Sequence, residues 1–105
     1  MVEQVHDHAL AVRYHDGVVH VVGEIDMSTC SLLDEMLSKL DTALPVLVDL
    51  SEVAFMDSHG LRVLIVHNNR RADDHCGLTI VDPSEQVRRL LEITGLEANF
   101  HVESQ

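Results

Sequence analysis

The sequence predicts an α/β domain in which a mixed β-sheet of four to five strands is flanked by three to four helices. Two observations lead to this fold class. Two short β-branched runs surround an Asp-Gly pair at residues 16–17, the strongest short-range signal for a hairpin. Two further apolar runs of strand length, residues 46–50 and 78–81, alternate with stretches of helical period. Strands alternating with helices form parallel pairs through right-handed crossovers, so the sheet should be mixed.

The chain should open with two antiparallel strands between residues 9 and 25, on either side of the Asp-Gly turn. The period then changes, because the apolar residues between 30 and 40 recur at helical spacing. Asp26 or Ser28 can cap the first turn of this helix, which should end near Asp41.

Pro45 precedes the continuous run VLVDL at residues 46–50, which is typical of a central strand covered on both faces. A second helix is expected from about Leu61 to Asp74, and Gly77 should end it. The polar and apolar residues of this stretch separate onto two faces, as in a helix that packs against a sheet.

LTIV at residues 78–81 predicts another short buried strand. The following segment is a good helix start, with Asp82 as N-cap and Pro83 in the first turn. This third helix should stop at Gly95, and residues 99–102 can add an edge strand or simply cover the core.

Length and composition predict one cytoplasmic domain spanning residues 1–105. The chain is 46% hydrophobic, enough for one core, but no stretch approaches the roughly 20 apolar residues of a membrane helix. The N-terminus lacks the basic and then apolar order of a secretion signal. Cys30 and Cys76 lie far apart without a metal-binding pattern, so both are expected to be packing residues.

The net charge of −11 argues against nucleic acid and against anionic membrane surfaces as partners. A basic protein partner fits this charge better. General acidity of the whole proteome is an equally simple explanation.

The sequence Asp57-Ser58-His59-Gly60 lies where the central strand gives way to the second helix. Functional groups collect at such carboxyl ends of parallel strands. The free N–H groups and dipole of the helix favour negative charge near Ser58, and Gly60 keeps the backbone approachable. Plain helix capping is the simpler explanation of Asp57 and Ser58, and it can coexist with phosphorylation of the serine.

Three segments carry a family resemblance: GEID at residues 23–26, VDLSEVAFMDSHGLRVLI at 48–65 and GLTIVDPSEQVRRLLEITGL at 77–96. In this order they resemble the STAS domain family, and specifically the single-domain bacterial anti-sigma factor antagonists, whose hallmark is a DSSGL or DSTGL turn. The resemblance covers almost the whole chain. It implies a mixed β-sheet flanked by helices, in agreement with the periodicity.

The resemblance also implies a function. In that family the serine at the position of Ser58 is phosphorylated by an anti-sigma factor that is also a GHKL-type serine kinase, and a PP2C-type phosphatase removes the phosphate. The unphosphorylated antagonist binds the anti-sigma factor and frees a sigma factor. By this likeness, the partner-binding residues are expected to be Glu24, Asp26, Asp57, Ser58, His59, Gly60 and Arg62.

Two residues depart from the family pattern. His59 stands where the family usually has Ser or Thr, and Arg62 where it often has Gly. His59 can make recognition pH-dependent, since its reference pKa is about 6.5. Arg62, one helical turn after Ser58, can reach a phosphate or obstruct a partner. A STAS module in another assembly, stressosome-like or constitutive and unphosphorylated, is therefore the alternative function.

Enzymatic, metal and nucleotide functions are less well supported. Adjacent Asp, Ser and His side chains diverge and do not form a catalytic triad, and no GxSxG motif is present. The pairs His6 with His8 and His15 with His20 lack a recognised metal-binding spacing. The sequence contains neither of the glycine-rich phosphate-binding motifs of nucleotide-binding proteins, GxxxxGK[ST] and GxGxxG. We therefore expect no catalysis, no cofactor, no metal and no small-molecule substrate.

Overall fold

The computed structural model describes residues 3–72 and 77–104 and confirms the α/β fold class. Its sheet has six strands in the order β1-β2-β3-β4-β5-β6, one more than the expected upper limit. The first three strands pair antiparallel and the remaining pairs are parallel, so the sheet is mixed. The elements are β1 (Glu3–His6), β2 (Leu10–His15), β3 (Val18–Ile25), α1 (Cys30–Lys39), β4 (Val46–Met56), α2 (Ser58–Ala72), β5 (Leu78–Val81), α3 (Glu85–Thr94), the 3₁₀ turn η1 (Glu97–Asn99) and β6 (His101–Glu103).

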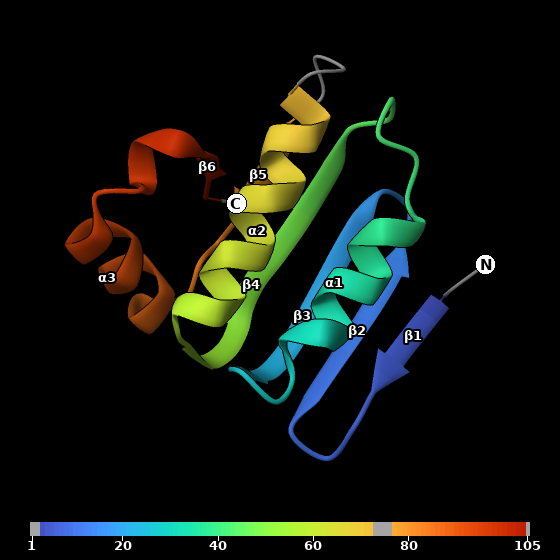
Figure 1. Ribbon diagram of the computed structural model, residues 1–105, viewed down its shortest axis with the longest axis horizontal. Coiled ribbons are helices and arrows are strands. Elements are labelled where there is room, and N and C mark those ends of the chain that lie inside the picture. The colour runs from blue at the N-terminus through green and yellow to red at the C-terminus, as the bar shows by residue number, and fades with distance from the viewer. Residues whose placement is uncertain (1–2, 73–76, 105) are drawn as a thin grey trace.

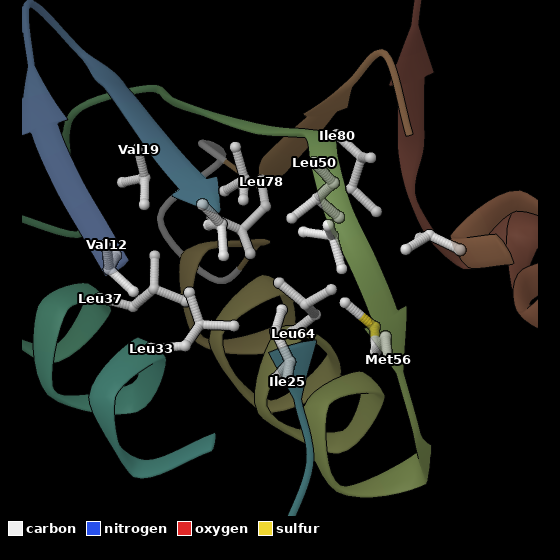
Figure 2. Packing of buried hydrophobic residues seen from close by; sticks show 14 of the residues in the cluster. Val12, Val19, Ile25, Leu33, Leu37, Leu50, Met56, Leu64, Leu78 and Ile80 are labelled. Atoms are coloured by element: carbon white, nitrogen blue, oxygen red, sulfur yellow. The ribbon is translucent and has the colours of Figure 1, made fainter. Parts of the chain in front are cut away.

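The helices α1 and α2 lie side by side over one face of the sheet, and α3 lies on the far side of α2 from α1 (Figure 1). Buried side chains of the strands point toward α1 and α2 and form the core with side chains such as Leu33 and Leu64 (Figure 2). Cys30 is half-buried against this core, as expected for a packing residue. Cys76 and the predicted helix end at Asp74 lie outside the described residues.

The expectation that residues 46–50 are covered on both faces is wrong. Val46, Val48 and Leu50 are buried, whereas Leu47 and Asp49 are only half-buried on the face that α1 and α2 do not cover. There the Asp49 carboxylate lies 3.2 Å from the His20 ring. Asp49, the polar residue in this otherwise apolar run of five, therefore lies on the face of the sheet that α1 and α2 do not cover.

The junction before the second helix also differs from the prediction. β4 continues to Met56, six residues past Leu50, and α2 begins at Ser58 rather than near Leu61. The polar residues Ser51 and Glu52 interrupt the apolar pattern, so the sequence does not indicate the second half of the strand. In β4 the register of the β3–β4 pairing shifts twice. Ser58 therefore lies in the first turn of the helix, close to its unpaired N–H groups.

The start of α3 corrects the predicted cap. Ser84, not Asp82, is the N-cap, and its Oγ accepts a hydrogen bond from the N–H of Val87. Asp82 adopts a positive φ of 47°, so the chain still turns there and has not yet entered the helix. The predicted stop at Gly95 is confirmed by its left-handed conformation, with φ of 71°.

The two ends of the sheet are short edge strands. β6 pairs with β5 and confirms that the C-terminal stretch adds an edge strand. The sequence does not predict β1. Val5 is its one residue that packs against the core, and a single apolar residue cannot show the alternation that is typical of a strand. Within the described residues, none of the helices has the length and apolar character needed to cross a membrane.

Candidate functional site

The fold brings the ends of β3 and β4 together at one edge of the sheet. The N–H of Asp57 donates a hydrogen bond of 3.1 Å to the carbonyl oxygen of Ile25. The two segments singled out in the sequence, Glu24–Asp26 and Asp57–Ser58, therefore lie next to each other although residues 27–56 lie between them in the chain. This arrangement follows from parallel pairing, which places carboxyl ends at the same edge.

Asp57 caps α2. Its Oδ1 accepts hydrogen bonds from the N–H groups of His59 at 2.8 Å and Gly60 at 3.4 Å. The capping explanation is thus correct for Asp57 but not for Ser58. The Ser58 side chain is exposed, and its hydroxyl makes no hydrogen bond with the other described residues. A hydroxyl at the start of a helix, free of the cap, is available to another molecule.

Asp26 has a structural task in the neighbouring loop. Its Oδ1 accepts hydrogen bonds from the Ser28 hydroxyl at 2.7 Å, the Ser28 N–H at 2.9 Å and the Thr29 N–H at 3.1 Å. These bonds, those from Ser28 first, lower the pKa of Asp26 below its ordinary value. The Thr29 hydroxyl in turn donates to the carbonyl oxygen of Glu24 at 2.7 Å. The Glu24 side chain itself is exposed.

Gly60 is required for close packing between α2 and the sheet. A Cβ built at this position would lie 2.6 Å from Cγ2 of Ile25 and 2.9 Å from Cγ of Met56. Both of those side chains are fully buried, and Gly60 itself is buried. The glycine therefore lets the first turn of α2 approach the sheet. The expectation that it keeps the backbone approachable to a ligand does not match this inward position.

The two unusual residues of the turn are both exposed. The His59 Nδ1 lies 3.4 Å from Oδ2 of Asp57, so the ring faces the capping carboxylate. Arg62 lies one turn after Ser58 on the exposed side of α2 and makes no hydrogen bond or ion pair with the other described residues. Both cationic or potentially cationic side chains thus stand on the surface around Ser58.

Sequence reasoning missed two residues near the site, Gln86 and Met27. The Gln86 side chain in α3 accepts a hydrogen bond from the Met56 N–H at 2.8 Å and donates one to the Met56 carbonyl oxygen at 2.9 Å. This pair of bonds fixes the backbone just before Asp57. Met27, in the loop after β3, is 73% exposed. No local pattern points to Gln86, because its partner is 30 residues away.

The histidine pairs considered for metal binding do not converge. His15 lies 3.0 Å from its neighbour Asp16, and His20 pairs with Asp49. His6 and His8 are exposed. In the part of the chain that the structure describes, no three metal-ligating side chains gather in one place.

Comparison with known proteins shows the family of this chain. The family model described as Mlab, STAS domain, matches residues 8–102. An anti-sigma-B factor antagonist of Staphylococcus aureus is 35% identical over 86 residues, which are 80% of each chain. The crystal structure of an anti-sigma factor antagonist from Mycobacterium paratuberculosis has 30% identity and a TM-score of 0.75, covering 98% of this chain and 86% of that chain.

More distant structures share the fold alone. The antagonist SpoIIAA in its unphosphorylated form has 19% identity and a TM-score of 0.68, covering 92% of this chain and 88% of that chain. The phosphorylated form of the Bacillus cell fate determinant SpoIIAA has 17% identity and a TM-score of 0.62, covering 92% of each chain. The chain belongs to the STAS domain family. Within that family its resemblance to anti-sigma factor antagonists is confirmed.

Proposed function

We propose that this protein is a single-domain, cytoplasmic anti-sigma factor antagonist. Its unphosphorylated form binds an anti-sigma factor that is a GHKL-type serine kinase, and so frees a sigma factor. The kinase phosphorylates Ser58 and switches the antagonist off, and a PP2C-type phosphatase restores it. The observation that carries this proposal is the exposed Ser58 hydroxyl, which begins α2 while Asp57 alone provides the cap.

The surroundings of Ser58 support a phosphorylation switch. The helix dipole favours an anion at the first turn of α2, and Arg62 lies one turn further along. A phosphate adds about −1.5 to −2 charges and three acceptor oxygens. Because the hydroxyl is already exposed, these charges arrive on the surface without disturbing the core. Their effect is therefore on the partner rather than on the fold.

The acidic residues around the serine support a basic partner. Glu24 is exposed at the end of β3, and Asp57 lies beside Ser58. Complementary charge accelerates association and excludes wrong partners. We place Glu24, Asp57, Ser58, His59 and Arg62 on the contact surface. Asp26 and Gly60 contribute indirectly, by holding the loop and the helix in position.

A second function is favoured by Arg62, which is exposed where a partner has to approach Ser58. A guanidinium at this place can exclude the family's usual kinase by steric and charge conflict. The domain would then serve as a constitutive module, or within a stressosome-like assembly. In that case its partner is not an anti-sigma factor kinase.

The test is phosphate transfer to the purified protein. The candidate anti-sigma factor kinases of the source genome are each purified and incubated with it and radiolabelled ATP. One of them should label the wild type and not Ser58→Ala, whereas Ser38→Ala, which removes an exposed serine hydroxyl from α1, should be labelled like the wild type. Labelling that persists in Ser58→Ala, or no labelling by any of these kinases, would contradict the proposal.

A further inference from the structure

Two exposed apolar side chains lie on the segments that adjoin Ser58, the loop after β3 and the helix α2. Met27 is 73% exposed at the tip of the loop between β3 and α1, and Val66 is 44% exposed on α2. Isolated apolar residues on a surface are common, so exposure alone assigns them no role. Their positions relative to Ser58, and the rigidity of the loop, set them apart.

The loop that carries Met27 is held on both sides. The Asp26 carboxylate accepts hydrogen bonds from Ser28 and Thr29, as described above, and the N–H of Asp26 donates to the Thr29 hydroxyl at 3.0 Å. Thr29 is only 2% exposed. Met27 is thus presented to solvent from a fixed backbone. A side chain presented in this way loses less entropy on binding than one on a mobile loop.

The exposed side of α2 continues this surface. Ser58, Arg62 and Val66 follow one another at intervals of four residues, so each is rotated by about 40° from the last. All three are exposed, whereas Leu61 and Leu64 point into the core. Val66 lies about 12 Å along the helix axis from Ser58. Met27 follows Ile25 by two residues, and the carbonyl oxygen of Ile25 accepts the hydrogen bond from the N–H of Asp57, the residue before Ser58.

We infer that Met27 and Val66 are the apolar anchors with which the unphosphorylated protein binds its anti-sigma factor, an inference that rests on the proposed function. A kinase that transfers phosphate to Ser58 has to cover the start of α2, and the loop of Met27 borders that place. The partner surface therefore has an apolar pocket for the thioether side chain. Basic residues beside the pocket face Glu24 and Asp57, in keeping with the net charge of −11.

This arrangement gives phosphorylation a direct means of release. Ser58 begins the helix that carries Val66, and its neighbour Asp57 is hydrogen-bonded to Ile25, two residues before Met27, so a phosphate on Ser58 would be drawn into the same contact. Burying a dianion against apolar surface carries a large desolvation cost. Met27 and Val66 would then lose their contacts with the anti-sigma factor at the same time. The switch works without any change in the fold.

The test is the affinity of Met27→Gln for the anti-sigma factor that labels the wild-type protein, measured by calorimetry without ATP. The control is Ile93→Gln, which alters a similarly exposed side chain (76%) on α3. Met27→Gln should bind about tenfold more weakly, and Val66→Thr should also bind more weakly. Ile93→Gln should stay within about twofold of the wild type. In phosphate transfer, Met27→Gln should raise KM for the protein substrate and leave kcat unchanged.

The outcomes separate this inference from the proposed function. If wild type binds and Met27→Gln matches it within about twofold, or Ile93→Gln loses as much affinity, the anchors are wrong while the proposed function stands. If none of the source genome's anti-sigma factors binds the wild type, the proposed function fails and this inference fails with it.

Discussion

Replacing Gly60 by alanine tests the close approach of α2 to the sheet. The added methyl group would lie 2.6 Å from Ile25 and 2.9 Å from Met56, and both side chains are at most 1% exposed, so neither can move away freely. Overpacking of a core costs about 1–3 kcal/mol. Alanine recovers up to about 1 kcal/mol through its higher helix propensity. Taking about 2 kcal/mol for the overpacking and about 1 kcal/mol for the recovered propensity, we expect a net loss of about 1 kcal/mol in the free energy of unfolding.

The measurement is urea unfolding followed by circular dichroism, with Ser58→Ala as the matched control in the same helical turn. Ser58 is exposed and does not cap, so its alanine variant should lie within about 0.5 kcal/mol of the wild type. A Gly60→Ala protein as stable as the wild type, or more stable, would refute the packing argument. It would show that helix propensity decides the residue at this position.

Three further predictions concern stability. Asp57→Ala should lose about 1 kcal/mol of unfolding free energy, because the cap bonds to α2 are removed, and Asp57→Asn should keep most of it; equal values for the two would contradict the cap. Gln86→Ala should cost about 1–3 kcal/mol by leaving both polar groups of the Met56 backbone without their partner, and an unchanged urea midpoint would refute this. The pKa of Asp26 is lowered on folding, so its stabilisation is present above the unfolded value of about 3.9 and lost as the pH falls through the folded value. The stability advantage of wild type over Asp26→Asn should therefore shrink as the pH falls below about 4, whereas a constant difference would contradict it.

The elements with a clear local sequence signal, such as a hydrophobic period or a turn residue, were predictable from the sequence. The Asp-Gly hairpin, the helix after it and the left-handed stop at Gly95 rest on local chemistry, and the structure confirms each. Boundaries set by distant residues were not predictable. β4 continues past Ser51 and Glu52 because β3 pairs with it there, and nothing within the strand signals this.

The position of the candidate site was predictable from the sequence, but the structural role of each residue in it was not. The strand-to-helix junction and the acidic residues near it could be identified in the chain. Which of Asp57 and Ser58 forms the cap depends on backbone geometry that both residue types satisfy equally well. The inward role of Gly60 depends on Ile25, from another strand, and the clamp of Gln86 on Met56 depends on how α3 packs. Such contacts belong to the tertiary structure.

The central claim is that phosphate on Ser58 decides whether this protein binds its partner. The most direct measurement compares the affinities of the unphosphorylated and the Ser58-phosphorylated protein for the anti-sigma factor that labels it. We predict that the unphosphorylated protein binds and that the phosphorylated one binds at least about tenfold more weakly, with an unchanged circular dichroism spectrum. Equal affinities for the two forms would contradict the switch and leave a constitutive STAS module as the better description.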